Sequence, residues 1–220
     1  MAALSHLSTA AVADVLGGKG VMCSSIGPYG KVHKFVGRAF TASTPPGDML
    51  TCYKALHDAL GGMVLVIDGN GYQEAAIWGG LMTREAGLKG LAGVVINGAV
   101  RDLDEIRKSD LPVFAVSACA RDGTINAFGE IGAPINCGGA TVHTGDYILG
   151  DEDGVIAIPE GRVDKIIDAA TGALEMETTI VGELDKGKSL YDLFELEKIV
   201  VRKEHEDFTL LNELIRDLGF

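Results

Sequence analysis

Short apolar runs, each bounded by turn residues, are the clearest pattern in the middle of the chain. Three of them lie at residues 63–68, 93–97 and 112–116 and are rich in β-branched side chains. Unbroken runs of this length are typical of strands that are buried on both faces. Segments of helical length, at residues 73–88 and 101–108, lie between these runs. Alternating strands and helices predict right-handed crossovers on a largely parallel sheet, and hence an α/β fold.

The segments that flank this alternation have other patterns. Residues 8–16 have apolar side chains at helical spacing and are followed by two glycines, a common helix stop. Between residues 135 and 158, short β-segments alternate with Gly-Asp turns. From about Glu160 the pattern is charged and helical, and a last amphipathic stretch lies at residues 208–218. We therefore expect a β-rich section and then C-terminal helices after the α/β core.

The composition is that of a globular protein. The chain has 220 residues, of which 47% are hydrophobic and 30 are glycine, so it can bury a core and form many turns. We expect one domain at residues 1–196 and a helical extension at residues 197–220. No apolar run approaches the ~18 residues of a membrane span, and the first residues do not have the pattern of a signal peptide. These features predict a cytoplasmic protein with no membrane partner.

Charge and cysteine content argue against several other classes of function. The formal net charge is −12, whereas nucleic-acid binding normally uses a basic patch, so no nucleic-acid partner is expected. The five histidines show no spacing that is typical of metal ligands. The cysteines form no C-x-x-C pair, so we interpret them as buried free thiols. They are Cys23, Cys52, Cys119 and Cys137.

The segment Asp68-Gly-Asn-Gly-Tyr-Gln follows the first apolar run and partly matches a dinucleotide-binding turn. In such a turn, glycines allow the backbone to approach a pyrophosphate at the start of a helix. The third glycine of that pattern is missing after Gly71. A simple turn is therefore the favoured interpretation, and a nucleotide cofactor is not expected.

A glycine pair, Gly79-Gly80, lies near the start of a helical segment and is followed by Leu81 and Met82. Backbone N–H groups at a helix start lack helical partners and can bind a carboxylate or a phosphate. The alternative is that the small residues allow close helix packing, and the pair by itself favours that alternative.

An Arg101-Asp102 pair follows the apolar run at residues 93–97. In an α/β sheet, ligands bind beyond the carboxyl ends of the strands, where this pair is expected to lie. The carboxylate can hold Mg²⁺ or Mn²⁺, and the guanidinium can bind an enolate or carboxylate oxygen. The alternative, a helix-start aspartate beside a surface arginine, stays open because two residues are too few to decide.

In their order and spacing, these segments resemble the RraA-like proteins over about residues 8–195. That family includes 4-hydroxy-4-methyl-2-oxoglutarate and 4-carboxy-4-hydroxy-2-oxoadipate aldolases, and the regulators of ribonuclease activity. The resemblance implies an α/β fold related to the swivelling phosphohistidine domain, with a β/β/α core. It also implies a homotrimer or homohexamer whose active sites lie between subunits. The segments that match are residues 37–42, 46–48, 79–80, 93–102, 112–115, 142–146 and 150–155.

The resemblance also implies roles for individual residues. Asp102 would be the direct protein ligand of a divalent cation, Mg²⁺ or Mn²⁺, and Arg101 would contact the 2-oxo oxygen of the substrate. The segment from Gly79 to Met82 would bind substrate, with the backbone of Gly80 and Leu81 receiving its carboxylate.

Two further carboxylates would come from a neighbouring subunit and support a water network in the site. Asp14 and Glu177 are the best matches for them, and both are expected to be catalytic.

The implied activity is that of a lyase that acts on a small 2-oxo acid. A 4-hydroxy-2-oxo diacid would be cleaved between C3 and C4, or oxaloacetate decarboxylated, through the same pyruvate enolate. One alternative is a non-catalytic regulator that docks to another protein, because relatives without activity can keep the Arg101-Asp102 pair. Another is a related lyase for a different small oxo acid.

Overall fold

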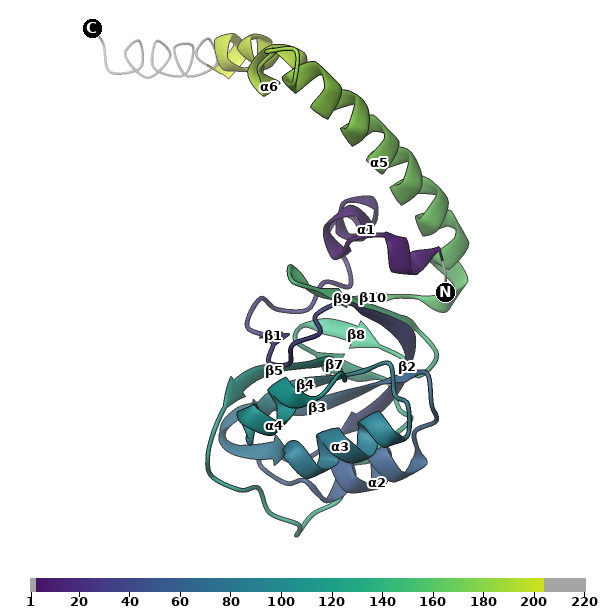
Figure 1. Cartoon of the computed structure of the whole chain (residues 1–220), viewed down its shortest axis with the longest axis vertical. Coiled ribbons are helices and arrows are strands. Elements are labelled where there is room, and N and C mark those ends of the chain that lie inside the picture. The colour runs from purple at the N-terminus through teal and green to yellow at the C-terminus, as the bar shows by residue number, and fades with distance from the viewer. Residues whose placement is uncertain (1–2, 204–220) are drawn as a thin grey trace, which may run out of the picture. The chain divides into compact units, whose positions relative to one another are not determined.

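The computed structural model describes residues 3–203 and contains one large mixed sheet (Figure 1). Its strands are, in spatial order, β1 (Gly27–Pro28), β5 (Val113–Ala118), β4 (Gly93–Val100), β3 (Met63–Trp78), β2 (Phe35–Ser43), β9 (Tyr147–Asp151) and β10 (Gly154–Ile158), and β6 (Glu130–Ile131) pairs with β2. Strands β2 to β5 are parallel neighbours, whereas the other pairs are antiparallel. A bridge between Val21 and Ile156 joins the segment before β1 to β10, so the sheet is nearly closed into a barrel. The predicted α/β fold is confirmed.

Helices and a separate hairpin complete the described part of the chain. The helices are α1 (Thr9–Leu16), α2 (Leu50–Asp58), α3 (Gly80–Leu88), α4 (Leu103–Lys108), α5 (Val163–Leu184) and α6 (Leu190–Leu193), with 3₁₀ turns η1 (Leu4–His6) and η2 (Glu160–Arg162), and the hairpin pairs β7 (Ile135–Cys137) with β8 (Ala140–Val142). Helix α1 lies beside β9 and β10, whereas α2, α3 and α4 lie on the other side of the sheet (Figure 1). Within residues 3–203, no helix has both the length and the apolar character needed to cross a membrane.

Internal contacts divide the chain into two units, Met1–Thr171 and Gly172–Phe220, and α5 runs through the boundary. Over its described residues the second unit is helical, with the end of α5, then α6 and a helical segment at residues 196–203. The helical pattern predicted from about Glu160 is confirmed to this extent. The amphipathic stretch at residues 208–218 lies outside the described residues, and the domain boundary after residue 196 stays a prediction.

Strand β3 shows why an unbroken apolar run forms a strand in this fold. Leu65 and Ile67 belong to the hydrophobic cluster that α2 and α3 cover, whereas Val64 and Val66 belong to the cluster on the opposite face. Successive side chains of a strand point to opposite faces, so both faces of β3 are buried. Burying one such side chain contributes about 1.5–3 kcal/mol.

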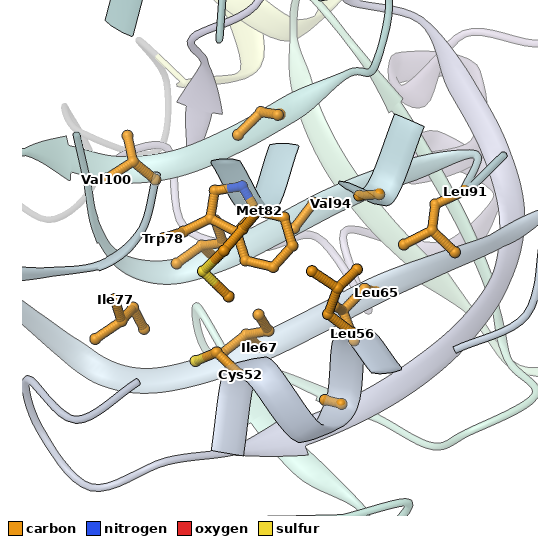
Figure 2. Close-up of a cluster of buried hydrophobic side chains, with 14 of the residues drawn as sticks. Cys52, Leu56, Leu65, Ile67, Ile77, Trp78, Met82, Leu91, Val94 and Val100 are labelled. Carbon is orange, nitrogen blue, oxygen red and sulfur yellow. The ribbon is translucent and has the colours of Figure 1, made fainter. Parts of the chain in front are cut away.

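The helix-covered cluster fixes α2 and α3 on the sheet. Figure 2 shows Cys52 and Leu56 of α2 close to Leu65 and Ile67 of β3, with Trp78 and Met82 in the same cluster. All of these side chains are at least 90% buried. The end of β3 and the start of α3 are therefore anchored in the core on either side of Gly79-Gly80.

The prediction of buried free thiols is correct for two of the four cysteines. All four are free, but only Cys52 and Cys137 are buried, whereas Cys119 is half-buried and Cys23 is exposed. Burial raises the pKa of Cys52 to about 12 and raises that of Cys137 as well. These two thiols are neutral at physiological pH and have a packing role.

One predicted helix begins too early. Residues 73–88 were expected to be helical, but β3 continues to Trp78 and α3 begins only at Gly80. Register shifts let β3 follow β4 beyond Asp68, so that Trp78 pairs with Val100. The apolar residues before Trp78 suit a buried strand as well as a helix, and the long-range pairing decides between them.

The Asp68-Gly-Asn-Gly segment lies inside this long strand. Asn70 and Gly71 have positive φ values of 59° and 66°, and the first register shift between β3 and β4 occurs at this position. No helix follows the glycines directly, so the arrangement that a dinucleotide-binding turn requires is not formed. The segment is a bulge, in agreement with the interpretation as a simple turn.

Candidate functional site

The carboxyl ends of three parallel strands meet on the side of the sheet that carries α3 and α4. Trp78 of β3 pairs with Val100 of β4, and Val100 pairs with Ala118 of β5. The residues that follow these strands therefore lie side by side. They are Gly79-Gly80 after β3, Arg101-Asp102 after β4, and Asp122 in the loop after β5. A small pocket of about 50 Å³ is lined by Gly79, Arg101, Asp102 and Asp122, with Met49, Tyr53, Ala76, Trp78, Leu81 and Met82.

Asp102 adopts a backbone conformation that is uncommon for a residue with a side chain. Its φ and ψ are 57° and 46°, in the left-handed region, which aspartate tolerates better than most residues. Such a conformation costs on the order of 1–3 kcal/mol and is concentrated at functional sites. Asp102 precedes α4, yet its side chain makes no capping hydrogen bond to that helix. Instead, its Oδ2 accepts a hydrogen bond from the N–H of Gly80 at 3.0 Å.

The glycine pair allows this close approach between α3 and α4. A Cβ atom at Gly79 would lie 2.8 Å from Oδ2 of Asp102. A Cβ atom at Gly80 would lie 2.9 Å from the Cβ of Glu105 and 3.2 Å from that of Asp102. Ordinary carbon contacts are about 3.5–4.0 Å, so side chains at either position would separate the two segments. The packing interpretation of the pair is thus correct, and what it packs against is Asp102 itself.

The start of α3 is held by its own hydrogen bonds. The N–H of Thr83 donates to the Gly79 carbonyl at 3.0 Å, which is the first bond of the helix. The Thr83 hydroxyl also donates to that carbonyl and accepts a hydrogen bond from the indole N–H of Trp78 at 2.8 Å. Because the N–H groups of Leu81 and Met82 precede this first helical bond, they have no partner within the helix. N–H groups in this position are the kind that bind anions in other proteins.

Arg101 lies between two carboxylates. Its Nη1 is 2.9 Å from Oδ2 of Asp122, and its Nε is 3.7 Å from Oδ2 of Asp102. Both contacts are ion pairs, and the one to Asp122 is the closer of the two. About a third of the Arg101 side chain is exposed, and about half of each carboxylate side chain, so this group is accessible to a small ligand.

The donor set around Asp102 fits a hard divalent cation that keeps most of its water. Among residues 3–203, no group of three or more His, Cys, Asp or Glu side chains is placed to hold a metal ion. Within the same range, both contacts of the Asp102 carboxylate use Oδ2, so Oδ1 is available. Mg²⁺ is commonly held by one or two carboxylates, with water and substrate oxygens completing the shell. Asp102 therefore suits Mg²⁺ or Mn²⁺ better than zinc.

A larger groove adjoins the small pocket and runs between α3 and α4. It has a volume of about 620 Å³, and Leu81 and Asp102 line both spaces. Arg84 is exposed and makes no ion pair within the described part of the chain. The groove thus joins an apolar surface to an unpaired guanidinium. Its lining residues are Gly80, Leu81, Arg84, Gly87, Leu88, Leu91, Asp102, Glu105, Lys108, Ser109, Asp110 and Leu111.

Most of the residues predicted from the sequence are brought together. Gly79 and Leu81 line the small pocket with Arg101 and Asp102, and Gly80 bonds to Asp102, as expected. The N–H of Gly80 donates to Asp102, and the expected role of the Gly80 and Leu81 backbone in binding the substrate carboxylate stays a prediction. Met82 as a whole residue is only 4% exposed, although it lines the small pocket.

The two carboxylates expected from a neighbouring subunit are exposed. Asp14 lies on α1, which is held against the sheet by hydrogen bonds from Thr9 to Asp151 and is on the other side of the sheet from α3 (Figure 1). Glu177 lies on α5 in the second unit. Exposure is necessary for a role in another subunit, and that role stays a prediction for both residues.

Asp122 is a site residue that the sequence reasoning missed. It lies in the segment Arg121-Asp122-Gly123-Thr124, which follows the apolar run at residues 112–116 at a distance of a few residues. The rule that ligands bind beyond the carboxyl ends of parallel strands applies to this run as well as to the one before Arg101. That rule could have indicated Asp122 as a candidate, but its ion pair with Arg101 depends on how the loop folds.

A buried carboxylate, Asp48, anchors the same loop. Burial alone raises the pKa of Asp48, but hydrogen bonds from the Thr124 hydroxyl and from the N–H groups of Leu50, Asn126 and Ala127 outweigh it, so the pKa lies below its ordinary value. These bonds are 2.6–3.1 Å long. Asp48 thus fixes the loop that contains Asp122 against the start of α2.

Comparisons with known proteins match most of this region. A model of the RraA-like family, described as Aldolase/RraA, matches residues 9–157, which include the glycine pair, Arg101-Asp102, Asp122 and Asp14, but not Glu177. The chain is 36% identical over 132 residues to 4-hydroxy-4-methyl-2-oxoglutarate aldolase from Thermus thermophilus, covering 60% of this chain and 80% of that protein. It is also 36% identical over 162 residues to an uncharacterized protein from Methanocaldococcus jannaschii, covering 73% and 78% of the two chains.

A solved structure supports the same assignment of the fold. The RNA-processing inhibitor RraA from Thermus thermophilus superposes with a TM-score of 0.65 and is 32% identical in sequence. The match covers 70% of this chain and 93% of that one.

Proposed function

Because the chain belongs to the RraA-like family, we propose that it is a divalent-metal-dependent lyase that cleaves a small 2-oxo diacid through a pyruvate enolate. The proposed substrates are a 4-hydroxy-2-oxo diacid, cleaved as an aldol, and oxaloacetate, which is decarboxylated. The single observation that carries this proposal is the arrangement of Arg101 and Asp102 beside the free N–H groups at the start of α3.

Each group in this arrangement has a task in such a reaction. Asp102 would hold the cation, and the N–H groups of Leu81 and Met82 would bind the C1 carboxylate of the substrate. When bound, the cation would polarise the 2-oxo carbonyl as a Lewis acid. Arg101 would donate hydrogen bonds to the 2-oxo oxygen, whose negative charge grows as the enolate forms.

The bond changes balance without a redox partner. In aldol cleavage the C4 hydroxyl loses its proton, C4 becomes a carbonyl carbon, and the electrons of the C3–C4 bond pass to the enolate. A proton then adds to C3 and gives pyruvate. Oxaloacetate loses carbon dioxide instead and leaves the same enolate, so its reaction needs no base for a hydroxyl group.

The base for the aldol reaction is proposed to come from a neighbouring subunit. Asp14 and Glu177 are exposed carboxylates, and a water molecule would relay the hydroxyl proton to one of them. This part of the proposal requires a homo-oligomer, for which we propose a trimer or a hexamer.

The groove between α3 and α4 supports a substrate with a second carboxylate. Arg84 lies one turn along α3 from Gly80, and both line the groove together with Asp102. The Arg84 guanidinium, which has no ion-pair partner among residues 3–203, is a suitable receptor for the distal carboxylate, because a guanidinium matches a carboxylate with two parallel hydrogen bonds. The leucine side chains around it would pack against the carbon chain of the substrate.

The proposal is tested by the release of pyruvate from oxaloacetate and from 4-hydroxy-4-methyl-2-oxoglutarate, coupled to lactate dehydrogenase. We expect activity with Mg²⁺ or Mn²⁺ that is lost in EDTA and in Asp102→Asn, which keeps the side-chain shape but removes the charge. Asp104→Asn is the matched control, because Asp104 is an exposed carboxylate on α4. Equal activity in chelator, or in Asp102→Asn, would refute the role of the metal site.

A non-catalytic regulator is the second candidate function. It is favoured by the similarity to the RNA-processing inhibitor RraA from Thermus thermophilus. If no substrate is turned over with either cation, while the folded protein binds and inhibits an RNA-processing enzyme, this second candidate replaces the first.

A further inference from the structure

Two carboxylates compete for Arg101, and the structure places one of them closer. Asp122 forms an ion pair with Nη1 at 2.9 Å, whereas Asp102 lies 3.7 Å from Nε. An arginine has five N–H donors, so the pair with Asp122 leaves the others for a ligand. The guanidinium is thus held beside Asp102 without a hydrogen bond to it.

The position of Asp122 is fixed by backbone hydrogen bonds on both sides. The N–H of Ala76 donates to the Arg121 carbonyl at 2.8 Å, and the N–H of Gly123 donates to the Ala76 carbonyl at 2.9 Å. The next residue, Thr124, bonds to the buried Asp48. A Cβ atom at Gly123 would lie 2.8 Å from the Ala76 carbonyl oxygen, so the loop lies close against β3. Asp122 is therefore held in place by the fold.

We propose that Asp122 is a positioning residue that keeps the Arg101 guanidinium from approaching Asp102 more closely. This inference rests on the proposed function, in which Asp102 holds a divalent cation and Arg101 binds the 2-oxo oxygen. Those two tasks conflict, because a guanidinium and a carboxylate of neighbouring residues tend to pair with each other. A closer pair between Arg101 and Asp102 than the present contact of 3.7 Å would neutralise the cation ligand and occupy the donors that the substrate needs.

The carboxylate of Asp122 resolves this conflict. With Nη1 bound to Asp122, Arg101 keeps one orientation in which Asp102 retains a free oxygen. Without Asp122, Asp102 is the one ion-pair partner that Arg101 retains among residues 3–203. Only the molecules in which Arg101 has left Asp102 would then bind the cation, so the apparent dissociation constant rises by the inverse of that fraction.

The test is binding of Mn²⁺ alone, followed by electron paramagnetic resonance of the free ion, in four full-length proteins. They are the parent, Asp122→Asn, Arg101→Gln and the double variant. In the parent background, Asp122→Asn is expected to raise the dissociation constant for Mn²⁺ about three- to tenfold, if a tenth to a third of the molecules stay competent. In the Arg101→Gln background the same change is expected to have no effect, because there is no guanidinium to hold.

This cycle separates positioning from a direct electrostatic effect. Asp122 is itself an anion near the cation, and simple loss of its charge would weaken Mn²⁺ binding equally in both backgrounds. Equal weakening would therefore overturn the proposal, and so would unchanged binding in the parent background. Asp104→Asn controls for the loss of one carboxylate on the same side of the sheet and is expected to bind Mn²⁺ like the parent.

Failure of this inference and failure of the proposed function give different results. If Asp102→Asn binds Mn²⁺ as tightly as the parent, the metal site itself is wrong. If Asp102→Asn loses binding while Asp122→Asn does not change it, only the positioning role is wrong. Thermal melts check that each variant folds, and Asp122→Ser takes the place of Asp122→Asn in the same cycle if the latter does not fold. Asp122→Glu, which keeps the carboxylate, is expected to retain most of the parent's affinity for Mn²⁺.

Discussion

Replacing Gly80 with alanine tests whether the site depends on the close approach of α3 and α4. The added Cβ would lie 2.9 Å from the Cβ of Glu105 and 3.2 Å from the Cβ of Asp102. Both contact atoms are attached directly to the backbone of the segment that begins α4, so no side-chain rotation relieves the overlap. Relief to an ordinary carbon contact of about 3.5 Å requires the two segments to separate by roughly half an ångström.

Separating α3 from the start of α4 lowers the free energy of unfolding, and a matched variant on α3 allows this loss to be measured. Overpacking of a close contact costs about 1–3 kcal/mol. Alanine also has a higher helix propensity than glycine, which by itself stabilises the helix. Gly87→Ala on the same helix measures this propensity gain without a clash, because the nearest atom to the added Cβ would be the Ser109 hydroxyl oxygen at 4.0 Å. We expect Gly87→Ala to stabilise the protein by about 0.5–1 kcal/mol, and Gly80→Ala to destabilise it. For a chain of this size, each kcal/mol shifts Tm by about 2–4 °C.

The same displacement has a cost in function. Gly80 donates to Oδ2 of Asp102 at 3.0 Å, so moving α3 lengthens that bond and moves the N–H donors of α3 away from the substrate. A misplacement of about 1 Å costs on the order of 10²-fold in rate, so half of that distance is expected to lower kcat/KM about tenfold. The assays are thermal melts at equal protein concentration and pyruvate release with Mn²⁺. If Gly80→Ala matches Gly87→Ala in melting and the parent in activity, the close-approach reasoning is refuted.

Three further predictions concern charged groups. Arg101→Lys keeps the charge but loses the planar fork, so it is expected to raise the barrier for kcat by about 2–4 kcal/mol, whereas Arg107→Lys on α4 should leave the rates unchanged. The pKa of Asp48 in the folded protein lies below its ordinary value of about 3.9. The ionised carboxylate therefore stabilises the fold above about pH 3.9, and this stabilisation is lost as the pH falls through the folded pKa. Asp48→Asn should accordingly lower Tm at pH 7, with a difference from the parent that shrinks below about pH 4; a difference independent of pH would contradict this assignment. Finally, coexpression of Asp14→Asn with Asp102→Asn should restore roughly a quarter of the sites if each site joins two subunits of a closed oligomer, and activity no higher than that of the two variants apart would exclude Asp14 from the site.

The local pattern determined the parts of the fold that depend on nearby residues. The helix expected at residues 8–16 is α1, because Ser8 accepts a hydrogen bond from the N–H of Ala11 and Gly17 ends the helix with a φ of 59°. The three apolar runs became β3, β4 and β5, since their side chains are buried on both faces of the sheet. Parallel order then put Arg101-Asp102 at a carboxyl edge, where the sequence predicted it.

Other features required contacts between residues that lie far apart in the sequence. Residues 73–78 continue β3 instead of beginning a helix because the bulged strand stays paired with β4, and the apolar pattern fits either structure. Asp122 was not predicted for the same reason. Its ion pair with Arg101 forms only when the loop after β5 is bound to Ala76.

The glycine pair shows most clearly what the sequence determines and what the tertiary structure determines. The sequence shows that Gly79 and Gly80 permit a close approach, since neither has a side chain. It does not show which segment approaches them, because that depends on the packing of α3 against the residues before α4. The tertiary structure decides that the partner is Asp102, and a packing motif thereby becomes part of the proposed metal site.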